Sequence, residues 1–557
     1  MIRSPSVRSS FVVLTLLGFA GCSGSGTGSV VVTPAHGPVL TCSTQMMSAT
    51  VMGETDQTVS WSISDDSSHG SIDMTSGLFT APNAMPTPST ATVVATAKAG
   101  GLKGTSLLTL GTAFPSAARP ITGSAGYNSF DTGIYHNTVV AKGMRVYAVW
   151  PDNPAGGTTV GLKVARSDDG GATWMAPVTA ATLPLKSGKA IPDAFIRCPG
   201  LAIDAGNPDV VYAIGGATGP VDPGIPDDSL DSDSTQLIAI SSDGGATWTQ
   251  HNIAVGPAMI CADVASPAPD TVVVVGPGWD CTVPNAGRDV FVWSDANRGA
   301  GFATGAVIQS PQEYFADGYT KGLDDLNNDP ACTQEHLSVE SDGTTDAGGD
   351  ATESPRLFTD GAGHLCVSYI GDINHANAMM DVNVYVQCSS DAGKTWTAPV
   401  NVDGADAPKV SRSVVGSIAP NGNVTIIWTS GKNGGLYTST STDGGKTFAP
   451  RSQAPHPIKF SGDTELAEAL NPMAAYDAAG ILWVGYRAYD GSQEQVMVDK
   501  SCDGGTTWSG VRSIDTPASA MRYPQFALTP GAAPMLATWA ADHMATYTLI
   551  PAATTTN

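Results

Sequence analysis

Four arginines stand just before short apolar stretches, and together they have the chemistry of an anion site. They are Arg197, Arg356, Arg412 and Arg522. A planar guanidinium group donates two parallel hydrogen bonds to a carboxylate, so several arginines that converge could clamp an acidic ligand. The alternative is that each arginine caps a loop or forms a surface ion pair. The choice depends on where the fold places the apolar stretches.

A repeated aspartate is the second group of candidate residues. Five copies of the pattern Ser-x-Asp-x-Gly-x-Thr-(Trp/Phe) occur along the chain, and a degenerate sixth copy lies at residues 294–302. The aspartates of the five good copies are Asp169, Asp243, Asp391, Asp443 and Asp503. Carboxylates can act as catalysts or metal ligands, but catalysis does not need five equivalent copies. We therefore predict a structural role for them.

Each copy of the motif follows a strand-like run and precedes another short strand, which predicts a β-hairpin. The aspartate can accept hydrogen bonds from backbone N–H groups of the turn. The glycine common to all copies suits a backbone position with positive φ. The closing Trp or Phe is large and apolar enough to hold the hairpin against a neighbouring sheet.

Seven pairs of apolar strands recur between these hairpins, which is typical of a propeller. The pairs lie at residues 138–150, 200–215, 262–276, 357–370, 414–428, 474–486 and 525–539. The last pair lacks a complete outer strand, and residues near Pro120 could supply it and close the ring. We predict an all-β fold with a seven-bladed propeller, six blades being the alternative, preceded by a small Ig-like β-sandwich.

The repeated motif resembles the Asp-box (BNR) repeat of the sialidase superfamily, and the resemblance covers about residues 113–550 of a propeller domain that we place at residues 113–557. It implies that the boxes lie at the periphery of the propeller, away from the active centre. A sialidase uses three arginines to clamp the substrate carboxylate, a tyrosine nucleophile activated by a glutamate, and an aspartate as acid and base. Because one superfamily fold hosts several activities, the resemblance does not by itself assign one.

The resemblance suggests a site residue by residue. Asp152 is the candidate for the acid/base, Tyr523 for the nucleophile and Glu465 for the glutamate that activates it. The candidates for the carboxylate clamp are Arg197, Arg356, Arg412 and Arg522. Glu468 is a second candidate for the glutamate, and Arg487 for the clamp. One departure from the family is clear: the Arg-Ile-Pro motif expected before the first blade strand is replaced by Tyr-His-Asn at residues 135–137.

The net charge and the N-terminal residues limit the possible location and partners of the protein. The formal net charge is −24, which argues against nucleic acid or an anionic membrane surface as a partner. Residues 1–21 resemble a bacterial lipoprotein signal peptide, Cys22 would be lipidated, and residues 22–28 would form a Gly/Ser tether. An ordinary signal peptide is the alternative. We expect an exported, envelope-anchored protein, periplasmic or surface-facing, that meets the membrane only through its lipid.

The region before the propeller forms a separate module in this interpretation. Residues 29–112 carry no Asp box and resemble bacterial Ig-like domains, with Trp61 as the core residue. Such a module would serve as a spacer or, alternatively, bind a glycan or a partner.

Among the cysteines of an exported chain, Cys366 and Cys388 fall on consecutive strands of one predicted blade and could pair.

An acidic insertion at about residues 317–353 separates the third and fourth pairs of strands. Its closely spaced carboxylates and amides could hold Ca²⁺. The full calcium-loop pattern is absent, so a solvated polar loop is the favoured interpretation, and no cofactor is otherwise expected.

Two functions follow from these residues. In the first, the propeller binds a glycan or an envelope or extracellular protein at its central mouth without standard sialidase chemistry. In the second, it is a divergent exo-acting glycoside hydrolase of the sialidase type. The missing Arg-Ile-Pro motif favours the first function.

Overall fold

The protein is described by a computed structural model, which divides it into two compact units. The second unit comprises Val39–Ser43, Ala81–Ser89 and the chain from Leu110 onward; the remaining N-terminal residues form the first. The residues that the structure describes are 28–111, 119–121, 137–154, 156–190, 195–218, 234–253, 262–279, 288–299, 306–309, 355–371, 383–403, 411–430, 435–453, 472–489, 494–509, 512–513, 521–527, 535–540 and 545–549.

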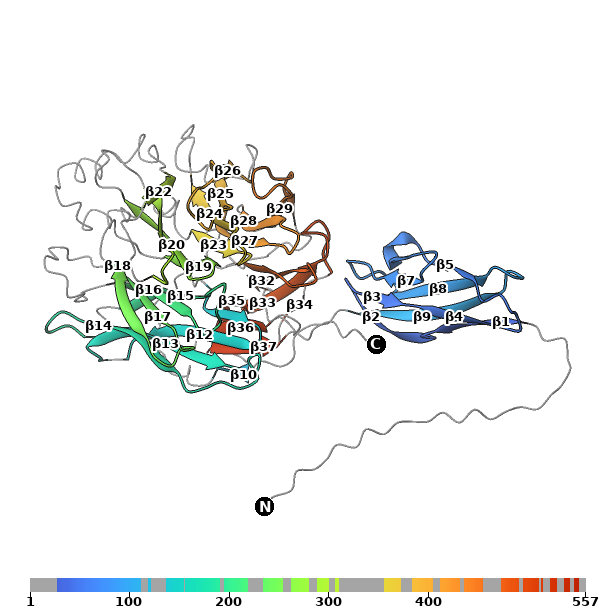
Figure 1. Ribbon diagram of the computed structural model, residues 1–557, viewed down its shortest axis with the longest axis horizontal. Coiled ribbons are helices and arrows are strands. Elements are labelled where there is room, and N and C mark those ends of the chain that lie inside the picture. Colours follow the sequence, from blue (N-terminus) through green and yellow to red (C-terminus); the bar gives the residue numbers. More distant parts are fainter. Residues whose placement is uncertain are drawn as a thin grey trace, which may run out of the picture. The chain divides into compact units, whose positions relative to one another are not determined.

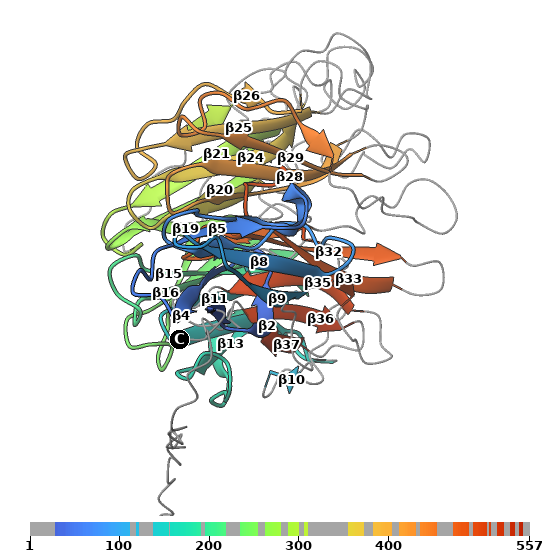
Figure 2. The ribbon, with the colours of Figure 1, turned by 90° about the vertical axis from the view of Figure 1, so that its right-hand side faces the viewer.

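The N-terminal strands form three small sheets, with the orders β1-β4, β2-β9-β8-β5 and β3-β7-β6. β5, β8 and β9 run side by side in both views (Figures 1 and 2). Trp61 is buried as predicted, and Gly77 (φ +77°) packs so closely on its ring that no side chain would fit there. The Ig-like assignment of residues 29–112 stays a prediction. The strand bounds are β1 (Ser29–Thr33), β2 (His36–Leu40), β3 (Thr44–Met46), β4 (Ser48–Met52), β5 (Val59–Ile63), β6 (Ser71–Ile72), β7 (Leu78–Thr80), β8 (Thr90–Ala97) and β9 (Lys103–Gly111).

The strands that follow form seven four-stranded antiparallel sheets within the described residues, which we number as blades one to seven. Blades one to three are β11 (Val139–Lys142), β12 (Arg145–Asp152), β13 (Thr159–Ser167), β14 (Val178–Pro184); β15 (Phe195–Ile203), β16 (Val211–Thr218), β17 (Ser234–Ser241), β18 (Thr249–Ile253); and β19 (Asp263–Ala268), β20 (Thr271–Trp279), β21 (Arg288–Asp295), β22 (Ala306–Gln309).

Blades four to seven continue the same order. They are β23 (Arg356–Thr359), β24 (Leu365–Gly371), β25 (Asn383–Ser389), β26 (Val400–Asn401); β27 (Ser411–Ile418), β28 (Val424–Ser430), β29 (Gly435–Ser441), β30 (Ser452–Gln453); β31 (Met473–Tyr476), β32 (Leu482–Tyr489), β33 (Glu494–Ser501), β34 (Arg512–Ser513); and β35 (Met521–Ala527), β36 (Met535–Ala540), β37 (Ala545–Leu549), β10 (Arg119–Pro120).

The first strands of the blades form a closed ring. Each contacts the first strand of the next blade, from β11 through β15, β19, β23, β27 and β31 to β35, and β35 contacts β11. These strands lie nearest the centre of the propeller, and fourth strands such as β14, β18, β22 and β26 lie at its rim (Figure 1). The preferred prediction of seven blades is confirmed.

The seventh blade obtains its outer strand from the N-terminal edge of the propeller. β10 pairs with β37, with Arg119 opposite Tyr547 and Pro120 opposite Thr546. The adjacent Ile121 is 1% exposed. The predicted closure near Pro120 is therefore confirmed, and it covers a sheet edge that would otherwise remain unpaired.

The sheets bury both of their faces, because each lies between two others. In β12 every residue from Val146 to Pro151 is buried, without the alternation expected of a strand with one solvated face. Tyr147, Val149 and β15's Ile196 share one apolar cluster, so the core of the propeller lies between blades.

The repeated motif joins the third strand of a blade to the fourth, and its geometry is the predicted one. In the first copy, Asp169 accepts hydrogen bonds at Oδ1 from the Thr173 backbone N–H (2.8 Å) and at Oδ2 from the Thr173 hydroxyl (2.6 Å). Ser167 Oγ donates to Asp169 (2.8 Å) and accepts from the Gly171 N–H (2.8 Å). The same bonds recur around the other four aspartates. All five aspartates are occupied within their own turns, as a structural role requires.

In each later box, the glycine two residues after the aspartate also packs the blades together. It adopts positive φ, and a β-carbon there would lie against the preceding blade, in ordinary contact at Gly245 and more tightly at the other three. The pairs are Gly245 with Tyr147, Gly393 with Val273, Gly445 with Cys388, and Gly505 with Thr438. Thr440 and Thr438 of blade five also donate hydrogen bonds to the carbonyls of Gly504 (2.8 Å) and Gly505 (3.2 Å).

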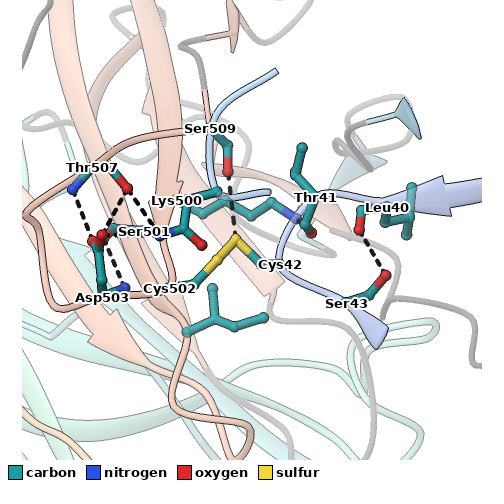
Figure 3. Close-up of a disulfide and its surroundings, with 12 residues drawn as sticks. Leu40, Thr41, Cys42, Ser43, Lys500, Ser501, Cys502, Asp503, Thr507 and Ser509 are labelled. Carbon is teal, nitrogen blue, oxygen red and sulfur yellow. Dashed lines mark hydrogen bonds between the residues drawn. A yellow bond between two sulfur atoms is a disulfide. The ribbon is translucent and has the colours of Figure 1, made fainter. Parts of the chain in front are cut away.

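Two disulfides have both cysteines within the described residues. Cys366 and Cys388 stand opposite each other on β24 and β25 and are bonded, which confirms the predicted pairing. Cys42 is bonded to Cys502, which follows β33 directly (Figure 3). Nothing in the sequence pointed to the second bond, since its cysteines are 460 residues apart.

Several predictions concern segments outside the described residues: the signal peptide, Cys22, the tether and the acidic insertion at 317–353. Within the part of the chain that is described, no helix is long and apolar enough to cross a membrane.

We expect acid to destabilise the propeller between about pH 4 and pH 2. The hydrogen bonds from threonine lower the pKa of Asp169, Asp243 and Asp391 from 3.8 to about 2. Because the unfolded chain binds these protons at a higher pH than the folded one, the stabilisation is complete above the unfolded pKa and is lost as pH falls through the folded pKa. Thermal unfolding followed by circular dichroism should show the melting temperature falling in this window. The difference in melting temperature between the wild type and Asp243→Asn should shrink in the same window. A difference that does not depend on pH would contradict the stabilising role of the Asp243 carboxylate.

Replacing the second glycine of a box should cost more than replacing the first. Gly444 (φ +76°) has open space around it, so Gly444→Ala should cost only the left-handed backbone, about 1 to 2 kcal/mol. Gly445→Ala adds an overlap with Cys388 Sγ, worth about 1 to 3 kcal/mol more. Denaturant unfolding of the two variants measures both. Equal losses would mean that the inter-blade contact contributes nothing.

Candidate functional site

The beginnings of the seven first strands lie at one face of the ring, which we call the strand-start face. First and third strands of a blade run in the same direction because all neighbours are antiparallel. The Asp boxes follow the third strands and therefore lie at the opposite face. This geometry separates the structural aspartates from the candidate arginines.

All four arginines lie near the beginnings of first strands. Arg356 is the first residue of β23, Arg412 the second of β27, Arg522 the second of β35 and Arg197 the third of β15. The arginines therefore begin the strands instead of preceding them as loop residues, as the sequence pattern had suggested. The reason is that β15, β27 and β35 pair past a local irregularity and so extend further than their apolar residues alone indicate.

Backbone irregularities coincide with three of these arginines. The register of β15 shifts between Arg197 and Gly200, that of β27 between Ser411 and Ser413, and that of β35 between Arg522 and Gln525. A β-bulge changes the direction in which a strand presents its residues, and bulges are enriched next to functional sites. Blades two, five and seven thus share a backbone irregularity at the strand-start face.

Arg356 is buried at this face beside an acidic residue of the neighbouring blade. The residue is 6% exposed, and Asp263, the first residue of β19, is 1% exposed. Burial lowers the pKa of Arg356 to about 10, while the negative charge of Asp263 opposes that shift. Since this pKa remains well above neutrality, the face carries a buried positive charge that is matched by a buried carboxylate.

Asp263 also ties neighbouring blades together. Its Oδ1 accepts from the Val264 N–H (2.8 Å) and from Nδ2 of Asn137 (3.4 Å), and its Oδ2 accepts from the Leu357 N–H (2.8 Å). The carbonyl of Asn137 in turn accepts from the Leu201 N–H (3.1 Å). This chain of bonds joins blades one to four.

Sequence reasoning missed Asp263 and gave Asn137 no role. The available signal was position: Asp263 stands at the beginning of an apolar stretch just as the four arginines do. Asn137 adopts a positive φ of 38°, which asparagine tolerates better than most residues.

Some of the predicted catalytic residues lie among the residues that the structure describes, and others do not. Asp152 ends β12 at the strand-start face and forms an ion pair with Lys163 (Nζ to Oδ1, 3.1 Å). Tyr523 lies on β35 next to Arg522, and Arg487 lies on β32. Glu465 and Glu468 fall outside the described residues. The backbone therefore brings Asp152, Tyr523 and the four arginines to one face of the ring.

Among the residues that the structure describes, no group of three or more His, Cys, Asp or Glu side chains could hold a metal ion. The acidic insertion, where Ca²⁺ was considered, is not among them.

Loss of the Asp263 carboxylate should destabilise the propeller strongly. Asp263→Asn leaves Arg356 buried beside a neutral side chain and turns an amide group toward one of the two backbone N–H groups, for an expected loss of about 3 to 5 kcal/mol. The matched control is Asp270→Asn, which removes an exposed partner of Arg298 and should cost about 1 kcal/mol or less. Denaturant unfolding measures both, and similar losses would show that the buried pair has no special weight.

Comparison with known proteins gives a match to one family model and to several solved structures. Residues 333–544 match the family model described as a BNR repeat-like domain, and no curated protein matches the chain. Similar solved structures include a protein of unknown function from Dyadobacter fermentans (14% identity, TM-score 0.40, 65% of this chain and 96% of that one). Others are the α-L-arabinofuranosidase of Fusarium graminearum with arabinobiose (13%, 0.41, 66% and 95%) and the intramolecular trans-sialidase of Ruminococcus gnavus (13%, 0.37, 77% and 98%). Similarities this distant say nothing about the ligand of this chain. Part of the seven-bladed propeller thus resembles a BNR repeat-like domain.

Proposed function

We propose that this protein binds glycans that carry a carboxylate, at the strand-start face of its propeller. The observation that carries the proposal is the repetition of arginine at the beginnings of four first strands of one ring. Arginine is the side chain best suited to a planar carboxylate, because its guanidinium fork pairs with both oxygens. Acidic sugars such as sialic acid and the uronic acids present that group. A protein ligand with an exposed carboxylate is the alternative partner.

The overall charge makes a local basic site necessary. With a net charge of −24, the protein repels anions at long range, and only cations near the ligand can offset this. Arg356 remains charged in a buried environment, where electrostatic interactions are stronger than in water.

Binding without standard sialidase chemistry is our preferred form of the proposal. The Arg-Ile-Pro motif that the resemblance requires before the first blade strand is absent. Asn137, at the end of the replacing Tyr-His-Asn, is used to hold Asp263. The residues in place of the motif therefore include a structural contact and no clamp arginine.

A glycoside hydrolase is the second candidate, and the placement of Asp152 favours it. Asp152 stands at the end of a second strand, on the same face as the arginines, where an acid/base would be needed. Lys163 holds its carboxylate in place. Tyr523 would then be the nucleophile and Glu465 its activating partner.

We further propose that the protein works outside the cytoplasm, anchored through a lipid on Cys22, with residues 29–112 as a spacer. The signal-like residues 1–21 suggest export, and disulfides such as Cys366–Cys388 accord with an oxidising compartment. No cofactor is required for glycan binding, and Ca²⁺ at residues 317–353 remains the alternative.

Calorimetric titration with a sialylated oligosaccharide, an oligouronate and a neutral oligosaccharide tests binding. We expect binding of an acidic ligand, weakened about 10- to 100-fold by Arg522→Ala because a charge-assisted hydrogen bond is lost. The matched control is Arg166→Ala, which removes an arginine that bonds to Asp168 at the Asp-box face and should leave affinity unchanged. Equal binding of neutral and acidic ligands, or equal loss in both variants, would contradict a carboxylate clamp.

Turnover distinguishes the two candidate functions. A fluorogenic sialoside should not be hydrolysed if the propeller only binds. Hydrolysis that Asp152→Asn and Arg522→Ala both abolish, while Arg166→Ala does not, would replace the binding proposal with a divergent sialidase.

A further inference from the structure

The Cys42–Cys502 disulfide differs from Cys366–Cys388 in its surroundings. Cys42 belongs to the Val39–Ser43 segment, which lies in the same compact unit as the propeller, and Cys502 is the second residue of the last Asp box. Both residues are partly exposed. Cys366 and Cys388 are 2% and 5% exposed and lie within an apolar cluster of blades four and five. A soluble thiol therefore meets the first bond far more easily than the second.

A buried lysine lies beneath the segment that this disulfide holds. Lys500 is 2% exposed, and its Nζ donates to the carbonyl oxygen of Thr41 (2.9 Å), the residue before Cys42 (Figure 3). The amine also lies 5.5 Å from the centre of the Trp483 ring. Burial lowers the pKa of Lys500 to about 8, against the opposing effect of Asp477 and Asp499. Covering the amine thus disfavours its charged form.

A second segment adds contacts on the solvent side. Asn83, in Ala81–Ser89, donates from Nδ2 to Asp503 Oδ2 (2.9 Å) and Thr507 Oγ1 (2.9 Å) of the last box. The two segments are joined by the bond from the Cys42 N–H to the Pro82 carbonyl (3.3 Å). The Asn83 bonds are exposed to water, so they oppose release only weakly.

We propose that the Cys42–Cys502 disulfide is a thiol-sensitive latch: its reduction by a dithiol releases Val39–Ser43 from blade six and uncovers the amine of Lys500. One thiolate of the dithiol attacks a sulfur of the disulfide, forms a mixed disulfide and displaces the other cysteine as a thiolate, which takes up a proton. The second thiol of the reductant then closes on the mixed disulfide and frees the remaining cysteine. The cysteines gain two electrons and two protons, and the dithiol leaves as a cyclic disulfide.

Release follows reduction because the covalent bond is what keeps an ammonium group out of water. Without the disulfide, the segment is held at Lys500 by the hydrogen bond from the Lys500 amine to the Thr41 carbonyl. The amine gains hydration when the segment leaves. The last Asp box should survive, because its Ser501, Asp503 and Thr507 bonds are internal to the turn. The latch is therefore a local device and does not involve unfolding of the propeller.

The test is a titration of the purified protein with dithiothreitol, followed by alkylation and peptide mass spectrometry. Cys42 and Cys502 should be alkylated at concentrations that leave Cys366 and Cys388 oxidised. In the same samples, acetylation of Lys500 by an amine reagent should rise by about tenfold or more. Acetylation of the exposed Lys446 should stay constant, and circular dichroism should report an intact propeller.

Two variants make the test independent of the reductant. Cys42→Ser and Cys502→Ser should each make Lys500 reactive without dithiothreitol, whereas Asn83→Ala with the disulfide intact should leave it protected. If a variant fails to fold, the titration of the wild-type protein still decides. Opening of both disulfides at the same dithiothreitol concentration, or a Lys500 that stays protected after reduction of Cys42–Cys502, would overturn the latch.

Discussion

Each sheet of the propeller has two apolar faces, and both must be covered. A strand such as β12, buried along almost its whole length, is stable only between two neighbours. A row of such sheets leaves two uncovered faces, and a closed ring leaves none. The contact of β35 with β11 and the pairing of β10 with β37 close this ring, with a segment that precedes the first blade in sequence. Every other feature of the propeller depends on that closure.

The ring assigns different tasks to its two faces. At one face the Asp boxes satisfy their own backbone groups and present a glycine to the preceding blade, so that neighbouring blades approach closely. Because the Asp-box turns do this work, the candidate ligand-binding residues can lie at the opposite face. That face holds the beginnings of the first strands, where four arginines and Asp263 stand before apolar residues of the same strands.

A buried charge pair connects stability with the proposed function. Arg356 and Asp263 come from adjacent blades, and the bonds of Asp263 with Asn137 and Leu357 connect blades one, three and four. A cation that is fixed in position before a ligand arrives loses little freedom when it binds. The same contacts hold the ring together at the face that carries Arg356, so the binding proposal and the stability of this face are linked.

The sequence alone determined the features that are local in the chain. The Asp-box turns, the seven pairs of strands and the Cys366–Cys388 bond all join residues within about one hairpin, where turn chemistry and apolar runs are directly readable. It also placed the four arginines close to the first strands, although just before them and not on them. The tertiary structure decided which distant residues meet: Asp263 with Leu357, 94 residues away; Cys42 with Cys502; and Lys500 with Thr41. Asp263 and Leu357 meet because their blades are neighbours in the ring, and Thr41 and Cys42 meet blade six because Val39–Ser43 belongs to the same compact unit as the propeller. No local pattern of side chains encodes either arrangement.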